Sequence, residues 1–248
     1  MPIQRPRILH TAQMAENVVS SSKLNLSNDS ITPDHISHTV GHWEVIDTIA
    51  NGAGYVGESD GQIKFQSVFS TKYMVYWLHV GFMGFGNRSG SATNADIYLR
   101  YMSGSSDQNS TAYNGHIHRQ LSGNSSYSSI AITNANTGTI FEGQWDNHSG
   151  GMHGDIYFYN MHAPVFNTGG SIDKGSYYRP YYKSELMGYN NSETHYSGQT
   201  VHMRYNQDGA DDAIDGFKIF NSSNASAHPG TYMALYGLKH NPANTTSP

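Results

Sequence analysis

The sequence has 248 residues, a formal net charge of -5 at pH 7 and no cysteine, and only 13% of its residues are charged. These values exclude disulfides and a cysteine nucleophile, and without a basic stripe or a basic amphipathic helix they argue against nucleic acid and membrane partners. The abundance of Gly (26 residues) and Tyr (18 residues) is typical of many short strands joined by polar turns.

Residues 1–40 differ from the rest of the chain, because they hold few aromatic side chains and no strong strand pattern. Pro2, Pro6 and Pro33 disfavour a continuous helix, yet apolar residues are too frequent for a plain flexible linker. We therefore expect an extended arm that docks on another subunit, with arginines that pair with acidic groups there. The residues expected to make this attachment are Ile3, Arg5, Arg7, Ile8, Leu9, Val19, Leu24, Ile31 and Ile36.

A short pattern occurs twice in this arm, at residues 19–24 and 31–36. Both copies read as a branched apolar residue, a hydroxyl residue, two variable positions, a cationic residue or His, and an apolar residue. One interpretation is chance in a Ser/Thr-rich segment, and the other is an extended segment that lies on another chain. The first residues lack the unbroken apolar stretch of a signal peptide, so we expect assembly in a cytoplasm.

Strand signals begin after residue 41 and alternate with Gly/Asn-rich turns, for example at 51–54 and 167–170. Consecutive strands without helices between them favour antiparallel pairing, and about eleven of them predict an all-β fold, an antiparallel β-sandwich over 41–240. A polar tail follows at 241–248. The predicted strands are 43–49, 62–69, 73–82, 96–102, 129–133, 139–142, 155–161, 177–183, 200–204, 216–220 and 231–238.

The closing stretch GTYMALYGLK, residues 230–239, is apolar on both faces when it is read as a strand. This pattern predicts a strand that is covered on both sides, so that the C-terminal part of the chain is tied into the core. The period-two pattern of this and the other strands also predicts a set of buried residues. They are Trp77, Leu78, Val80, Leu99, Ile156, Phe158, Ile219, Leu235 and Leu238.

Two histidines with metal-ligand spacing, His116 and His118, fall on one face of an extended segment. A metal site needs one or two further ligands, which the sequence does not identify, and among 14 histidines such a pair arises by chance. We therefore predict no metal and no cofactor, and keep this pair as a weak candidate for an ion site.

Carboxylates cluster at Asp211, Asp212 and Asp215, and again at Glu142 and Asp146. A glycosidase needs two carboxylates that flank a sugar bond, but residues of this kind are also common in turns and at strand ends. The sequence contains no G-x-S-x-G elbow, P-loop or H-E-x-x-H motif. The pattern therefore favours turn residues, and we predict that the protein is not an enzyme.

The densest aromatic stretch is YYRPYY, residues 177–182. Its proline lacks an N–H group, which predicts an edge strand or a loop. The stretch either packs at the edge of the sheet or forms an exposed aromatic surface for a sugar ring or a neighbouring chain. The residues of this possible glycan or subunit contact are Tyr177, Tyr178, Arg179, Tyr181 and Tyr182.

The end of the chain resembles the closing hairpin of a virion structural protein family of tailed phages, usually called tail-fibre or structural proteins. The resemblance rests on the strand at 215–220, the polar turn at 221–224, Gly230-Thr231 and the Leu-Tyr-Gly-Leu-Lys at 235–239. The segments at 72–76 and 96–101 resemble the first two core strands of that family. The arm matches only loosely, through short I-T-x-x-K-I units found near the N-termini of phage fibre proteins.

The resemblance implies a jelly-roll-like sandwich located on a virion and assembled in the host cytoplasm, and it brings no catalytic residue. It further implies a fibre, spike or knob, a homotrimer as its related fibres usually are, contacts with other tail or capsid proteins, and an option for contact with host surface glycans. A capsid-decorating protein of the same fold and a carbohydrate-binding or glycan-degrading protein outside a virion are the alternatives.

Overall fold

The computed structural model describes residues 43–50, 62–70, 72–85, 94–109, 111–121, 127–145, 151–161, 179–190, 195–206, 214–222, 227–228 and 230–239. These residues form thirteen strands, all in antiparallel pairs, and no helix. In this part of the chain there is accordingly no apolar helix of membrane-spanning length. The predicted all-β, antiparallel character is confirmed.

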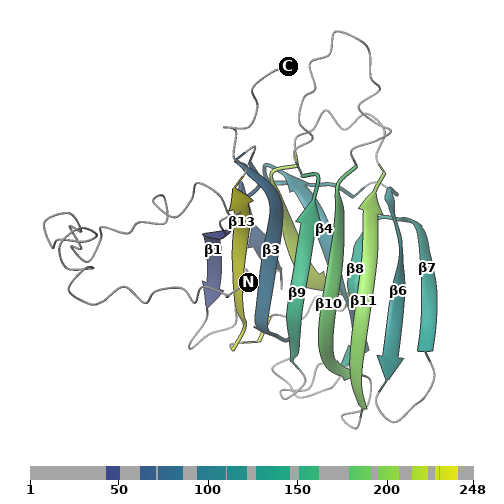
Figure 1. The fold of residues 1–248 in the computed structure, drawn as a ribbon. Helices are drawn as coiled ribbons and strands as arrows, with labels where there is room; N and C mark the ends of the chain where they lie inside the picture. The colour runs from purple at the N-terminus through teal and green to yellow at the C-terminus, as the bar shows by residue number, and fades with distance from the viewer. Residues whose placement is uncertain are drawn as a thin grey trace, which may run out of the picture. The chain divides into compact units, whose positions relative to one another are not determined.

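The strands form a wide layer with a narrow layer behind it (Figure 1). One backbone pair, between Asn190 and Gln144, connects the two layers in the sheet order. The wide layer runs in the order β1 (Trp43–Ala50), β13 (Tyr232–Lys239), β3 (Tyr73–Met83), β9 (Met152–Tyr159), β10 (Tyr181–Asn190), β11 (His195–Tyr205), β6 (Tyr113–Leu121) and β7 (Tyr127–Ala135). The narrow layer runs in the order β8 (Gly138–Trp145), β4 (Asn94–Ser103), β12 (Gly216–Asn221) and β2 (Ile63–Phe65), with β5 (Ser106–Asp107) beside β4.

The core lies between the two layers and follows the period-two alternation of the strands. In β3, for example, Tyr76, Leu78 and Val80 are fully buried, whereas the residues between them are partly exposed. Aromatic rings join the layers: Phe158 of β9 packs on Phe217 of β12 with the ring centroids 4.6 Å apart. Such ring contacts add to the stabilisation that burial of their apolar area already provides.

The closing strand β13 lies inside the sheet, between β1 and β3. Leu235 is fully buried on its inner face, but Leu238 on its outer face is only partly buried. Leu238 and Trp77, which lie on the same outer face, are therefore less completely covered than the other predicted core residues. The reason is that neighbouring aromatic side chains shield this face only in part. The other seven predicted core residues are fully buried.

Two strand assignments from the sequence need correction. Residues 113–121 form the full strand β6, which the pattern of strands did not predict. The strand predicted at 177–183 begins only at Tyr181, directly after Pro180, and lies between β9 and β11 rather than at an edge. The proline avoids the sheet by preceding it, so its missing N–H costs no ladder hydrogen bond.

Two ion-pair clusters fasten strands at the ends of this framework. On the narrow layer, Asp107 pairs with both Arg100 and the nearly buried Lys218, which lie opposite each other on β4 and β12. Near the start of β1, Glu44 pairs with Lys72 at 2.6 Å and with Lys239 at 2.5 Å. Each carboxylate therefore holds together segments that are far apart in the sequence.

Candidate functional site: the outer face of the wide layer

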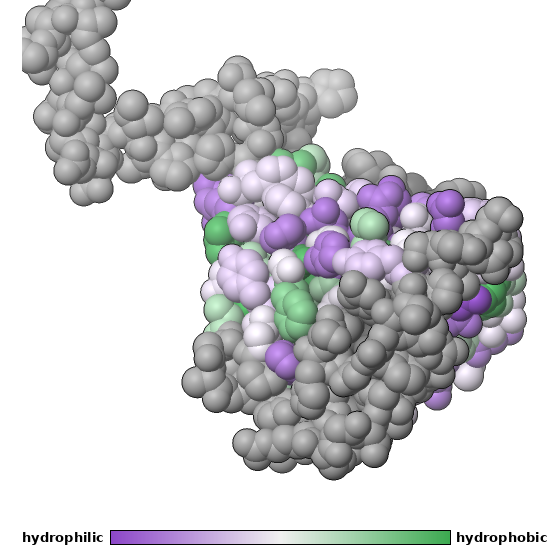
Figure 2. Space-filling view, turned by 90° about the horizontal axis from the view of Figure 1, so that it is seen from below, coloured by the Kyte–Doolittle hydropathy of each residue, from purple (hydrophilic) through white to green (hydrophobic). Residues whose placement is uncertain are grey.

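The outer face of the wide layer carries aromatic and basic side chains in rows that run across the strands. One row is complete in the backbone register, which places cross-strand neighbours next to each other on one face. It consists of Val45, Tyr236, Trp77, Tyr157, Lys183, His202, His116 and Ala131. The view from below looks along the strands at their ends, where hydrophilic and hydrophobic residues are interspersed over the coloured part of the surface (Figure 2).

The half of this face on β1, β13, β3 and β9 is aromatic. Trp77 stacks on Tyr236 with centroids 4.8 Å apart and on Tyr157 with centroids 6.4 Å apart, and Trp43 meets it edge-on. The first distance equals the spacing of neighbouring strands, about 4.8 Å. Stacked rings at that spacing turn their faces to each other, so this half presents ring edges rather than a flat platform.

Asp155 of β9 ties this aromatic half together. Its Oδ1 accepts a hydrogen bond from the Trp77 indole Nε1–H at 2.7 Å and lies 3.1 Å from His79 Nδ1. On the adjacent strand β10, Lys183 Nζ pairs with Glu185 Oε1 at 2.6 Å. The carboxylates on this face thus already have partners within it.

The other half of the face, on β11, β6 and β7, carries basic side chains and no carboxylates. None of the 11, 9 and 9 residues of these strands is Asp or Glu, although the whole chain is acidic. Three histidines meet here: His116 stacks on His202 at 5.2 Å and contacts His118 at 4.7 Å between ring centroids. The exposed Arg204 lies two residues from His202 on the same face of β11.

Backbone geometry brings the two histidine strands close together. A Cβ at Gly115 would lie 2.0 Å from the carbonyl oxygen of His202, so only glycine allows this approach of β6 and β11. The approach places His116 directly opposite His202 in the register. The row of rings is extended by Tyr127 of β7, which stacks on His118 at 5.6 Å.

The electrostatics of this half follow from crowding and burial. Partial burial lowers the pKa of His202, and the neighbouring His116, Lys183 and His118 lower it further because a second positive charge is unfavourable there. The Nδ1 atom of His118 is buried and has no hydrogen-bond partner among the residues described. Buried ring nitrogens usually have a partner, so this atom is an exception among the described residues.

The two weak ion-site candidates, His116 and His118, lie beside a third histidine. His116 and His118 do share one face, as predicted, and the third histidine beside them is His202. In the described part of the chain, however, no three His, Asp or Glu side chains are arranged to hold a metal ion. The sequence reasoning missed His202, although its place in the alternating V-H-M-R run at 201–204 put it on the same face as Arg204.

The described residues of the aromatic stretch at 177–182 lie in different environments. Tyr181 lies on the outer face and stacks on Tyr159 at 4.5 Å, but Tyr182 is buried in the core and its hydroxyl donates to the Thr139 carbonyl oxygen at 2.7 Å. The predicted surface contact is therefore wrong for Tyr182, because adjacent strand residues point to opposite faces. Arg179 is partly buried and donates to the carbonyl oxygen of Asn206 at 2.5 Å. Tyr177 and Tyr178 lie outside the described residues.

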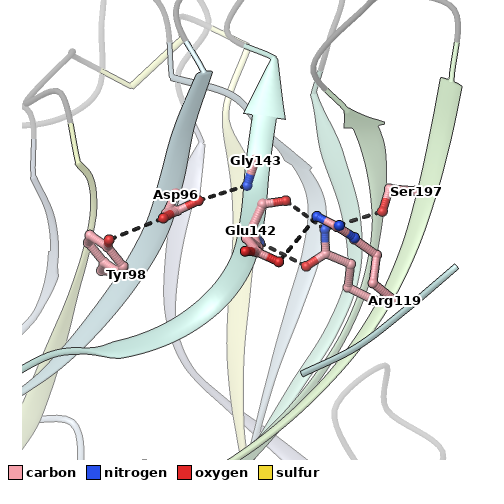
Figure 3. Close-up of polar contacts among 7 residues, drawn as sticks. Asp96, Tyr98, Arg119, Glu142, Gly143 and Ser197 are labelled. Atoms are coloured by element: carbon pink, nitrogen blue, oxygen red, sulfur yellow. Dashed lines mark hydrogen bonds and ion pairs between the residues drawn. The ribbon is translucent and has the colours of Figure 1, made fainter. Parts of the chain in front are cut away.

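A network of polar contacts joins β8 to the wide layer on one side and to β4 on the other (Figure 3). Glu142 of β8 pairs with Arg119 of β6 at 3.2 Å, and its backbone N–H and C=O both bond to the side-chain amide of Gln199 of β11. Asp96 of β4 accepts hydrogen bonds from the Gly143 N–H at 2.9 Å and from the Tyr98 hydroxyl at 3.2 Å. The Glu142 contacts connect β8 with the wide layer, and the Gly143–Asp96 bond connects β8 with β4 inside the narrow layer.

A glycosidase would need two of the clustered carboxylates for catalysis. The two of them that the structure describes, Glu142 and Asp215, both have structural partners. Glu142 is in the ion pair with Arg119, and Asp215 accepts from the Gly104 N–H at 3.0 Å while its own N–H donates to Met102. Asp146, Asp211 and Asp212 lie outside the described residues, as do all the predicted attachment residues of the arm.

Comparisons with known proteins add no relative: no family model, no curated protein and no solved structure matches this chain.

Proposed function

We propose that this chain is a non-enzymatic structural component of a tailed-phage virion, displayed on the particle as a fibre, spike or knob. Its body would be a jelly-roll-like β-sandwich, assembled as a homotrimer and anchored to tail or capsid proteins by the N-terminal arm. The outer face of the wide layer would be available for a neighbouring subunit or a host surface glycan.

The observation that carries the proposal is the place of the closing strand. The Leu-Tyr-Gly-Leu-Lys run, which resembles the end of the phage family, forms most of β13, and β13 pairs with β3 along eight positions. The strand also pairs with β1, and its residues Met233 and Leu235 are fully buried. The motif is thus made of residues that build the fold, as expected for a structural protein recognised by its framework.

Two further features support a structural role over catalysis. The described carboxylates in and beside the sandwich are held in ion pairs or backbone hydrogen bonds, as shown for Glu142 and Asp215. The outer face is rich in Trp, Tyr, His and Arg, which are favoured where proteins contact each other or a ligand.

Deletion of residues 1–40 tests the attachment part of the proposal. The truncated chain should remain folded, as judged by circular dichroism, because the core lies within residues 63–235. It should be absent from purified particles when it is expressed during infection in place of the full chain. If it joins particles at normal copy number, the arm is not the anchor.

Cryo-electron microscopy of particles tests the location. Density for this chain on the tail supports the fibre, spike or knob, and density on the capsid shell supports the alternative of a decorating protein. Complete absence from particles contradicts both and leaves the carbohydrate-binding or glycan-degrading alternative. Light scattering of the purified protein at micromolar concentration tests the homotrimer, which a stable monomer would contradict.

A further inference from the structure

We propose that the outer face of β10, β11 and β6 binds an acidic polysaccharide, and that this binding strengthens as the solution becomes more acidic. The contact surface, here called the histidine patch, consists of His116, His118, His202 and Arg204, with Lys183 at its border. The inference deepens the proposed function by assigning a glycan class to a defined surface.

The charge of the histidine patch is the first argument. Strands β11, β6 and β7 carry no carboxylate, and the nearest acidic side chain in the register, Glu185 on β10, is paired with Lys183 at 2.6 Å. Arg204 contacts the side-chain oxygen of Asn206, which is neutral. The patch therefore keeps a positive charge at neutral pH within a chain of net charge -5.

The pH dependence follows from the three imidazoles. Histidine is the side chain that ordinarily changes its charge between pH 5 and 8. The rings of His116, His118 and His202 lie within 5.2 Å of the next centroid, so their protonation adds charges that repel one another. The charged groups that face them are Lys183, Glu185 and Arg204, while Tyr127 covers the β7 side. A bound anion offsets this repulsion, so proton uptake and anion binding favour each other.

The neutral groups around the patch favour a polysaccharide among possible polyanions. Thr200, Gln120 and Ser129 share the outer face with the histidines in the strand register. Their hydroxyl and amide groups match the hydroxyls that separate the charged groups of an acidic sugar polymer. Nucleic acid, by contrast, presents a dense row of phosphates that requires many Lys or Arg contacts, and the patch has few.

The orphaned nitrogen of His118 is an independent observation. Its Nδ1 is buried without a partner among the described residues, next to the stacked Tyr127 ring. A ligand hydroxyl or a water carried with the ligand would satisfy it. In the described part of the chain, no group of three His, Asp or Glu side chains is arranged to hold a metal ion.

Calorimetric titration of the purified full-length chain with polygalacturonate, at pH 5.5 and 7.5 and low salt, tests the inference. Polygalacturonate remains charged at both pH values because its carboxyl groups titrate near the ordinary carboxyl range. We expect about fivefold tighter binding at pH 5.5 than at pH 7.5, the effect between these pH values of raising the pKa of one imidazole by about one unit in the complex, and a loss of affinity with added salt. Dextran, a neutral polymer, should not bind.

The variant His116→Gln/His202→Gln removes two of the three imidazoles of the histidine patch, so it should bind more weakly at pH 7.5 and lose most of the gain at pH 5.5. His79→Gln is the matched control, because His79 lies on the aromatic half of the same face, and it should behave as the wild type. Circular dichroism of all variants checks that they are folded.

Equal affinity of the wild type at both pH values, or an unchanged gain in the double variant, overturns the inference. Binding of a DNA duplex as tight as that of polygalacturonate at pH 5.5 would show a general polyanion surface and also overturn the polysaccharide assignment. The titration uses the isolated chain, so its failure leaves the virion proposal intact, and absence from particles leaves the titration result intact.

Discussion

The two faces of the wide layer differ in burial and in chemistry. On the inner face, Leu78, Ile156 and Leu235 are fully buried against the narrow layer. On the outer face of the same strands, Trp77, Tyr157 and Tyr236 form a partly exposed row of stacked rings. The inner face consists of tightly packed, buried apolar side chains. The outer face is partly exposed, with aromatic residues at one end and basic residues at the other.

An apolar or aromatic side chain in a strand of this layer can lie either in the buried core or on the partly exposed outer face. Tyr181 and Tyr182 are sequence neighbours, yet one stacks on the outer face and the other is buried with its hydroxyl bonded to the Thr139 carbonyl. A tyrosine suits both places because its ring packs and its hydroxyl hydrogen-bonds. The difference between the faces can be measured with pairs of matched substitutions.

The largest difference should come from the leucines of β13. Leu235→Ala should lower the free energy of unfolding by about 2–5 kcal/mol, because it leaves a cavity in a packed core. Leu238→Ala on the outer face should cost about 1 kcal/mol, because its side chain is only partly removed from water. Urea unfolding followed by fluorescence measures both. Equal losses would show that the outer face is covered as completely as the core.

The second prediction concerns the ion-pair cluster of Asp107, Arg100 and Lys218 on the narrow layer. Burial by itself would raise the pKa of Asp107, but hydrogen bonds from Lys218 and Arg100 outweigh it and lower that pKa. Asp107→Asn should destabilise the protein by about 2 kcal/mol, somewhat below the loss for a fully buried pair, since it leaves the two cations facing each other.

Replacing Lys218 at the same time provides the control for this cluster. Lys218→Met in the Asp107→Asn background removes the buried charge that has lost its partner, and the double variant should regain part of the stability. Chemical unfolding of the wild type, Asp107→Asn and the double variant measures the loss and the recovery of stability. A double variant less stable than Asp107→Asn would contradict the repulsion between Lys218 and Arg100.

The tyrosine pair should give a smaller difference. Tyr182→Phe removes the hydrogen bond to Thr139 and leaves that buried carbonyl without this donor, at a cost of about 1 kcal/mol. Tyr181→Phe should change stability by less than about 0.5 kcal/mol, because the ring stack with Tyr159 remains. Thermal unfolding of the two variants is sufficient, and a larger effect at Tyr181 would reverse the assignment of faces.

The smallest effect should appear at Glu44, and it should depend on pH. Hydrogen bonds from Lys239, Lys72 and Tyr73 lower the pKa of Glu44 to about 2. Because the pKa is lower in the folded state, the stabilisation is fully present above the ordinary carboxyl pKa of 4.5 and is lost as the pH falls toward about 2. Glu44→Gln should therefore cost less than about 1 kcal/mol at pH 7.

The pH dependence itself distinguishes this clamp from a packing effect. The stability difference between Glu44→Gln and the wild type should shrink as unfolding is measured from pH 6 down to pH 3. A difference that stays constant over this range would indicate that the substitution acts through packing at β1 rather than through charge.

The sequence alone determined the all-β fold and its antiparallel pairing, and it located most strands and most of the core. It could do so because alternation with period two and Gly/Asn turns are local signals, readable within a few residues. Seven of the nine residues predicted to be buried are buried. The exceptions, Trp77 and Leu238, are large apolar residues on a face that local pattern cannot distinguish from the core.

The tertiary structure alone decided which residues meet on the outer face. His116 and His202 are 86 positions apart, and they touch only because β6 pairs with β11 in one particular register, with a glycine at 115 that lets the strands approach. The same holds for Trp77 and Asp155, joined by a hydrogen bond across 78 positions. Register between distant strands is set by the sum of many packing contacts, so a row across a sheet emerges only when the whole sheet has formed.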